Sequence, residues 1–338
     1  MQSILFCGDT VMPFGIHIDI SEIKPIFEGK QAIVNLEGPI LPNENELKNY
    51  KWSDKYSVYS QPEVLKVCRE LNVKFASLCN NHILDYKYPI GKTEERLIAE
   101  GITPFGLKNH DVVKGELNGK PLYLITFATC TNDHALNLYN PDKVVEEIIR
   151  LKRLEDCYVV VYPHWGVERL KYVEPADRKH AHRMIDAGAD LIVGHHPHII
   201  QQVEQYKGKI IIYSIGNFLF PHAYYGDKKL VFDNPEIQDE LVVEWDGEQV
   251  RYHALHYDPK TDKIHILRDT ERYITELRAE VTDSEYTRLF KTKVSKVEFY
   301  IKRRLKDSDS GEKWCYRRRT AFRIIRKMMI KLGVHKPK

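Results

Sequence analysis

The sequence predicts an α/β fold that continues into C-terminal β-hairpins and a basic helical tail. Short apolar runs without polar alternation, typical of strands buried on both faces, recur along the first two thirds of the chain. Segments with apolar residues at helical spacing separate these runs, which favours a sheet covered by helices. With 338 residues the chain can hold one large domain and a smaller appendage, or two domains of ordinary size. We expect a main domain at 1–268 and a helical, basic extension at 269–338.

The first two strands end in polar side chains. The apolar run Ser3–Cys7 leads into Asp9, at the carboxyl end of its strand, where open α/β sheets bind their ligands. The second run, Ala32–Gly38, carries Asn35 and Glu37 on one side of the strand, because side chains alternate along a strand. Both strand ends are therefore placed for chemistry.

The third strand follows the same pattern. Val73–Cys79 leads to Asn80, Asn81 and His82, with Asp85 one helical turn further on. Asparagine there is compatible with an ordinary turn as well as with a ligand, so this strand end alone decides nothing.

Two later strands precede further candidates. Pro121–Ala128 carries none of these candidates, whereas Tyr158–Tyr162 ends at His164, with Glu168 a few residues beyond. A buried histidine beside a tryptophan is also an ordinary core feature. The functional interpretation therefore depends on the strand ends taken together.

The stretch that organises the rest is a strand followed by three histidines within four residues. After Leu191–Val193, Gly194 gives the backbone freedom to turn, and Pro197 stiffens the loop. His196 and His198 are one residue apart, so both can face one metal centre. The alternative is a polar surface loop with incidental histidines.

The connecting segments predict helices and a hairpin. Helices are expected at 62–71, 92–100, 143–154 and 176–187. Leu241–Trp245 and Gln249–His253 flank Asp246 and Gly247, a strong signal for a two-residue hairpin turn.

The strand-end side chains combine carboxylate, amide and imidazole groups. This mixture suits Mn²⁺, Fe or Zn²⁺, with carboxylates able to bridge two ions. The set contains no thiolate, which disfavours a structural zinc site and favours a hydrolytic centre. The six cysteines are scattered without a Cys-x-x-Cys pair, so we expect reduced, mostly buried thiols.

Six ordered motifs resemble the poly-γ-glutamate capsule-biosynthesis (CapA-type) family. They are Gly8-Asp9, Asn35-Leu-Glu37, Asn80-Asn-His-x-x-Asp85, His164-Trp-Gly166, Gly188 to His198, and Tyr213-Ser-Ile-Gly-Asn-Phe218. That family is similar in turn to the calcineurin-like metallophosphoesterases. The resemblance implies a two-sheet α/β sandwich with helices outside and a centre for divalent metal ions, two in number, at the strand ends.

The resemblance also implies roles for individual residues. The implied metal ligands are Asp9, Glu37, Asn81, His164, His196 and His198, with His195 as the main competitor to His196. His82 resembles the general acid and Asp85 the residue that orients it. We expect substrate contacts from Asn35, Glu168, His195 and Asn217. The chain departs from the phosphoesterase pattern at Val11, which replaces a histidine, and at Glu37, which replaces an aspartate.

Two functions follow from the resemblance. The first is metal-dependent hydrolysis of a phosphoester during capsule, poly-γ-glutamate or exopolysaccharide synthesis, with an anionic polymer or a phosphorylated small molecule as substrate. The alternative is a non-hydrolytic accessory protein that binds an anionic polymer or assembles a synthesis or export complex. Loops 41–60 and 221–240 are expected to shape the mouth of the site, with Tyr56, Tyr59, Tyr224, Tyr225 and Lys228 as candidate substrate contacts.

The C-terminal tail is strongly basic. Residues 301–338 hold 14 Lys and Arg against 3 Asp and Glu, so the rest of the chain is acidic overall. Apolar residues at helical spacing within 313–332 predict an amphipathic helix that either lies on anionic lipid or packs on the body. No motif accompanies the charge, so specific nucleic-acid binding is not expected. Because the chain opens directly with a strand and lacks a signal-like segment, we expect it in the cytoplasm, either free there or peripheral at the inner membrane face.

Overall fold

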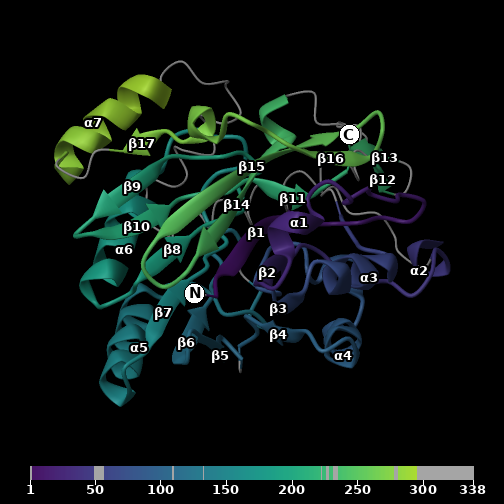
Figure 1. The fold of residues 1–338 in the computed structure, drawn as a ribbon, viewed down its shortest axis with the longest axis horizontal. Helices are drawn as coiled ribbons and strands as arrows, with labels where there is room; N and C mark the ends of the chain where they lie inside the picture. The colour runs from purple at the N-terminus through teal and green to yellow at the C-terminus, as the bar shows by residue number, and fades with distance from the viewer. Residues whose placement is uncertain are drawn as a thin grey trace, which may run out of the picture.

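The computed structural model describes residues 2–48, 57–108, 110–131, 133–221, 223–225, 228–230, 235–277 and 281–294. Two large sheets dominate this part of the chain (Figure 1). The first contains, in spatial order, β16 (Lys263–Ile266), β15 (Val250–Asp258), β14 (Asp239–Trp245), β1 (Ile4–Thr10), β2 (Gln31–Leu36), β3 (Val73–Ser77) and β4 (Thr103–Phe105), with β11 (Asn217–Leu219) paired to β1.

The second sheet is also mixed. In spatial order it contains β17 (Glu276–Leu277), β9 (Val203–Tyr206), β10 (Lys209–Ile212), β8 (Leu191–Val193), β7 (Tyr158–Val161), β6 (Lys120–Ile125) and β5 (Val112–Leu117). A small separate hairpin joins β12 (Ala223–Tyr225) to β13 (Lys228–Leu230).

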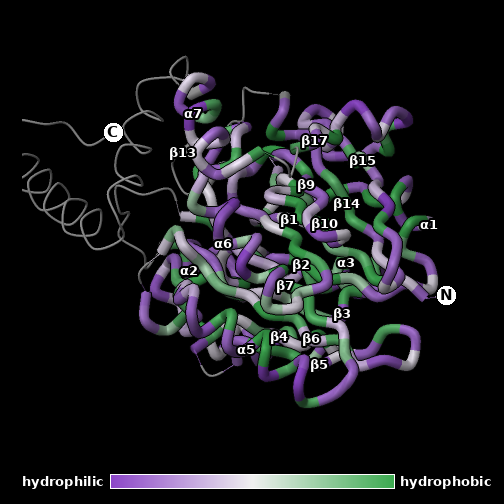
Figure 2. The backbone as a smooth tube through the Cα atoms, turned by 90° about the vertical axis from the view of Figure 1, so that its left-hand side faces the viewer, coloured by the Kyte–Doolittle hydropathy of each residue, from purple (hydrophilic) through white to green (hydrophobic). Residues whose placement is uncertain are grey.

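Apolar side chains between the two sheets form the inner core. Phe6 of β1 belongs to the same buried cluster as Val160 of β7 and Leu191 of β8. Its neighbour Leu5 points the other way, into the core beneath the outer helices, as the twofold alternation of a strand requires. The predicted two-sheet α/β sandwich is therefore confirmed, and Figure 2 shows the hydrophobic residues concentrated along the central strands.

Helices cover the outer faces of both sheets (Figure 1). The helices beside the first sheet are α1 (Lys24–Phe27), α3 (Glu63–Glu70) and α4 (Ile90–Ala99), and α2 (Asn45–Lys48) is a single turn nearby in the chain. Those beside the second sheet are α5 (Pro141–Leu154), α6 (Pro175–Asp186) and α7 (Asp283–Val294). The four predicted helices are confirmed to within two residues at each end. At α5 the start lies two residues earlier, because the side chain of Asn140 accepts hydrogen bonds from the first-turn amides.

The predicted hairpin joins β14 to β15, but its loop is longer than the expected two residues. Trp245 pairs with Val250, so residues 246–249 form the connection. The carboxylate of Asp246 accepts hydrogen bonds from the backbone amides of Glu248 and Gln249, at 3.0 and 2.8 Å, and this side-chain cap closes the wider loop.

The described part of the predicted extension packs on the main domain. β17 pairs in parallel with β9, and α7 lies against α6. Arg178, almost fully buried on α6, binds Glu204 of β9 at 2.8 Å and Asp283 of α7 at 3.0 Å.

A domain boundary at 268 stays a prediction. The predicted helix at 313–332 lies outside the described residues, and among the residues that are described no helix is long and apolar enough to cross a membrane.

The topology brings the carboxyl ends of the central strands to one edge. Asp9 on β1 is the parallel partner of Asn35 on β2. In the second sheet, single parallel bridges continue beyond the strands and join Ala128 to His164 and His164 to His195. The segments that carry the candidate residues are thus tied to one another by backbone pairing.

We expect Gly194→Ala to destabilise the protein by at least ~2 kcal/mol, because an added Cβ meets the Tyr213 carbonyl and the Trp165 indole nitrogen. Chemical denaturation measures the loss. Gly91→Ala is the matched control: its Cβ meets nothing within 4 Å, and we expect a gain of about 0.5–1 kcal/mol inside α4. Equal stability changes in the two variants would contradict the close packing at Gly194.

Candidate metal centre

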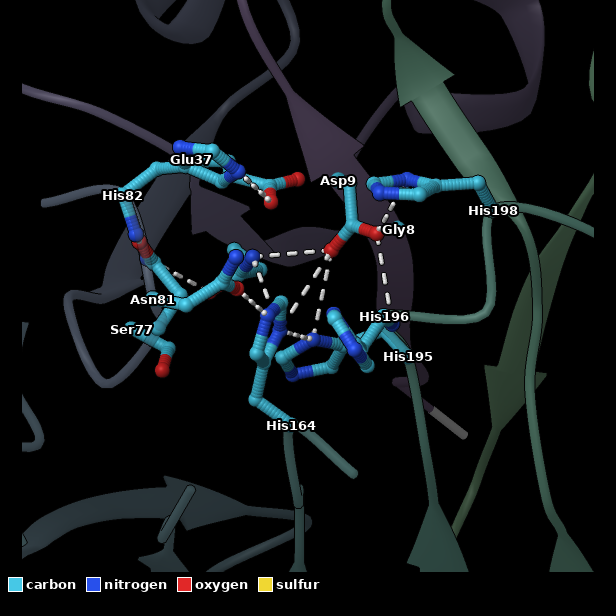
Figure 3. A network of polar contacts seen from close by, with 12 residues as sticks. Gly8, Asp9, Glu37, Ser77, Asn81, His82, His164, His195, His196 and His198 are labelled. Atoms are coloured by element: carbon cyan, nitrogen blue, oxygen red, sulfur yellow. Dashed lines mark hydrogen bonds and ion pairs between the residues drawn. The ribbon is translucent and has the colours of Figure 1, made fainter. Parts of the chain in front are cut away.

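The candidate residues converge from both sheets (Figure 3). Asp9 is the penultimate residue of β1, Glu37 follows β2, and Asn81 follows β3, all in the first sheet. His164 follows β7 and the three-histidine loop follows β8 in the second sheet. The rule that parallel strands present their carboxyl ends at one edge accounts for this convergence.

The carboxylate of Asp9 lies at the centre of the cluster and is fully buried. Its Oδ1 accepts a hydrogen bond from Asn35 Nδ2 at 2.8 Å and lies 3.3 Å from His195 Nδ1. Its Oδ2 accepts the backbone amide of His196 at 3.2 Å and lies 3.2 Å from His198 Nδ1. One carboxylate therefore ties the strand ends of the first sheet to the histidine loop of the second.

Burial and charge shift the pKa values in this cluster in opposite directions. Burial opposes ionisation of Asp9, but hydrogen bonds from His195 and His198 outweigh it and hold the Asp9 pKa well below its usual range. Burial also opposes the charged form of His198, yet the carboxylates of Glu37 and Asp9 raise its pKa to about 10. Burial and the neighbouring His196 hold the pKa of His164 well below its usual value.

A second carboxylate, Glu37, is also fully buried and faces the histidine loop. His82 Nε2 lies 3.8 Å from Glu37 Oε1. On the other side of its ring, His82 Nδ1 lies 2.6 Å from Asp85 Oδ2, and the backbone amide of Val58 donates to the same oxygen at 3.0 Å. Asp85 thus fixes the His82 ring so that Nε2 points towards Glu37 and the centre.

The amide side chains after β2 and β3 complete the polar lining. Asn81 Oδ1 lies 2.8 Å from His164 Nε2. Asn80, which the sequence interpretation did not assign, donates to Asn35 Oδ1 at 3.2 Å and to the Leu36 carbonyl at 2.8 Å. Asn80 therefore orients the Asn35 side chain, which in turn donates to Asp9.

Three overlapping groups of side chains bring their donor atoms within 4.8 Å of one another. They are Asp9, His164 and His195; Glu37, His196 and His198; and Cys130, His164 and His196. The sequence left His195 and His196 as competitors, whereas the structure places them in different groups, His195 with Asp9 and His196 with Glu37 and with Cys130. Buried carboxylates facing several imidazoles form a donor set that suits a divalent transition metal, so the residues present fit such an ion.

The histidine loop has a strained backbone. His196 and His198 have φ values of 103° and 59°, in the left-handed region that non-glycine residues rarely adopt. The amide of Arg169 holds the loop by donating to the Pro197 carbonyl at 2.8 Å. Gly194 was expected to provide this turn, but its φ is not in that region; it is required because Tyr213 and Trp165 approach too closely for a Cβ.

The remaining predicted residues lie at different distances from the centre. Asn217 Oδ1 lies 2.9 Å from His198 Nδ1, so Asn217 orients a candidate ligand; a substrate contact stays a prediction. Glu168 is half-buried, and its charge contributes to the raised pKa of His198. Val11 is buried in an apolar cluster with Leu41, so it supplies no donor.

Of the substrate contacts predicted at the mouth of the site, only Tyr59 has a described side chain. Tyr59 is only 2% exposed and packs on Phe14 and Tyr86, so it forms part of a core cluster. Tyr56 lies outside the described residues, and Tyr224, Tyr225 and Lys228 are described only as part of the β12 and β13 backbone.

Sequence reasoning missed Cys130. We expected no thiol in the donor set, yet its sulfur lies among the donors of His164 and His196. A usable signal was present, because Cys130 directly follows the predicted strand Pro121–Ala128, whose end had no polar side chain assigned to it.

Comparison with known proteins gives one family. The family model described as "Bacterial capsule synthesis protein PGA_cap" matches residues 3–222. The chain is similar to the PGA biosynthesis protein CapA of Bacillus subtilis, with 31% identity over 220 residues that cover 60% of this chain and 56% of that protein. It is also similar to the capsule biosynthesis protein CapA of Bacillus anthracis, with 32% identity over 237 residues that cover 64% of this chain and 57% of the relative.

The matched region thus spans little more than half the length of these curated relatives. Among solved structures, a protein described as a novel phosphatase from Mycoplasma pneumoniae aligns with a TM-score of 0.47 and 15% identity, over 80% of this chain and 95% of its own. A likeness at that level has no bearing on activity.

The pKa of His198 predicts how stability depends on pH in metal-free protein. An unfolded imidazole titrates near ~6.5, so the raised folded value of about 10 means a stabilisation that is complete below pH 6.5 and lost as pH rises towards 10. Urea unfolding with chelator, for the wild type and His198→Gln, measures it. We expect the stability difference between the two proteins to fall over this window; a difference independent of pH would contradict the assignment.

Proposed function

Because the chain belongs to the family of bacterial capsule synthesis proteins, we propose that it is a metal-dependent phosphoester hydrolase in the synthesis of a poly-γ-glutamate or exopolysaccharide capsule. Its substrate is a phosphorylated small molecule or an anionic polymer. One observation carries this proposal: two fully buried carboxylates, Asp9 and Glu37, each grouped with two histidines at the shared edge of the sheets.

Two of the donor groups share no residue, which supports the binding of two ions. Asp9 with His164 and His195 forms one group, and Glu37 with His196 and His198 forms the other. Asn81, beside His164, adds an amide oxygen. The donors suit Mn²⁺, Fe or Zn²⁺, and such ions supply Lewis acidity that neutralises charge on phosphoryl oxygens.

The chain itself supplies the proton for the leaving oxygen. His82 is nine-tenths buried, and its Nδ1 is held by Asp85 at 2.6 Å, so the ring presents Nε2 towards Glu37. In that orientation Nε2 carries the proton that the leaving alkoxide takes up. Asp85 positions the ring, and the Val58 amide holds Asp85 in place.

The alternative is a non-hydrolytic accessory protein that binds an anionic polymer. The high pKa of His198 favours this reading in one respect, because a buried imidazolium offers positive charge to an anion without any metal. An accessory protein needs the shape and charge of the site, whereas a hydrolase also needs Glu37 and His82. Substitution of Glu37 or His82 therefore distinguishes the two functions.

Metal content is the first test. We expect about two ions per chain after purification without chelator, measured by elemental analysis, and loss of metal in Glu37→Ala and His198→Ala. His265→Ala is the control, because His265 is 40% exposed on β16 and pairs with Glu22 instead. A wild type that takes up no metal even on reconstitution, yet binds poly-γ-glutamate, would exclude the hydrolase and leave the accessory role.

The role of His82 predicts a dependence on the leaving group. We expect His82→Ala to lower kcat on an alkyl phosphate by about 10²–10⁴-fold, and much less on an aryl phosphate whose leaving group needs no proton. Asp85→Asn should show the same pattern with a smaller loss, because it acts through His82. Metal content is the control and should not change in either variant. Equal losses on both substrates would rule out proton donation by His82.

A further inference from the structure

We propose that Cys130 is a thiolate ligand of the metal centre, forming with His164 and His196 a position that favours Zn²⁺, Co²⁺ or Cd²⁺ over Mn²⁺. This inference rests on the proposed metal centre and goes beyond it, because it adds a sulfur donor and a metal preference. The sequence motifs and the ligand roles carried over from them include no thiol.

Backbone pairing places Cys130 beside His164. Beyond β6, Ala128 forms a parallel bridge with His164, and the amide of Thr129 donates to the His164 carbonyl at 3.1 Å. In return, the amide of His164 donates to the Phe127 carbonyl at 2.9 Å. Cys130 is the next residue after this paired stretch, so its position is fixed by the sheet edge that also fixes His164.

The sulfur and an imidazole nitrogen converge on the same amide oxygen. Cys130 Sγ lies 3.5 Å from Asn81 Oδ1, and His164 Nε2 lies 2.8 Å from that oxygen. The sulfur is also 3.7 Å from the His164 carbonyl oxygen. Asn81 is itself a proposed ligand, so sulfur, nitrogen and oxygen donors lie next to one another.

The donor separations are compatible with coordination of one ion. Zn–S and Zn–N bonds of about 2.3 and ~2.1 Å allow two donors of one ion to be at most ~4.4 Å apart. The donors of Cys130, His164 and His196 lie within 4.8 Å of one another, so rotamer-scale adjustments bring them into range.

Cys130 also differs from the other described cysteines. Cys7, Cys68, Cys79 and Cys157 are buried, whereas Cys130 is half-buried at the edge of the cluster. Cys79, for comparison, has its sulfur 3.1 Å from the Asn137 carbonyl oxygen. Among the described cysteines, Cys130 is thus the one that is partly exposed and also grouped with histidine donors.

The chemistry of binding is a proton exchange without oxidation or reduction. The Cys130 thiol releases one proton to solvent, and a sulfur lone pair forms the bond to the ion. Thiolate is a soft donor that selects Zn²⁺ and its relatives, whereas the group of Glu37, His196 and His198 contains a harder carboxylate. A donor set that includes the sulfur of Cys130 therefore favours softer ions than a set without it, although it shares His196 with the Glu37 group and His164 with the Asp9 group.

Cobalt spectroscopy tests the inference on the full chain. Metal-free wild type, Cys130→Ser and the control Cys157→Ala are loaded with Co²⁺. Visible d–d bands report bound cobalt, and near-ultraviolet charge-transfer absorption reports a sulfur ligand. We expect both signals in wild type and in Cys157→Ala, and only the visible bands in Cys130→Ser. We also expect Cys130→Ser to weaken Cd²⁺ binding by at least about tenfold while Mn²⁺ binding changes little.

The possible failures are distinguishable. Visible bands without charge-transfer absorption in wild type would overturn the role of Cys130 and leave the metal centre intact. Charge-transfer absorption that persists in Cys130→Ser would overturn it equally. A wild type that binds no cobalt by either signal or by elemental analysis would overturn the proposed metal centre, and this inference with it.

Discussion

The structure depends on the hydrogen-bond partners of one buried carboxylate, that of Asp9. Asp9 has no exposed surface, so each of its oxygens must find partners within the protein. The parallel register of β1 and β2 brings the Asn35 amide to one oxygen, and the backbone of the histidine loop donates to the other. The position of the loop is thus set by the requirements of an aspartate nearly two hundred residues earlier in the chain.

Residues around the centre hold the candidate donors before any ion arrives. Asn217 orients His198, Asp85 orients His82, and Asn80 orients Asn35. The left-handed backbone at His196 and His198 costs of order 1–3 kcal/mol each, and the contacts of the loop with Asp9 and Arg169 offset that strain. Such support reduces the reorganisation that ligand binding requires.

The sequence predicted the convergence because it depends on a local signal, namely polar residues directly after buried strands. Asp9, Glu37 and His164 were identified in this way, and the structure brings them together. Details that depend on loop conformation and on packing between the sheets had no such signal. The separate groups of His195 and His196, the burial of Tyr59 and the contact that requires Gly194 follow from these longer-range relations.

The inner core between the sheets is apolar and therefore holds them together without directional preference, whereas the polar cluster at the edge is directional. The first sheet contributes Asp9 and Glu37 to that cluster, and the second contributes His164 and the histidines of the 195–198 loop. An ion held by donors from both sheets is also a cross-link between chain segments more than a hundred residues apart. Metal binding would then stabilise the position of the two sheets relative to each other. A ligand that binds only the folded state adds its binding free energy to the stability of that state.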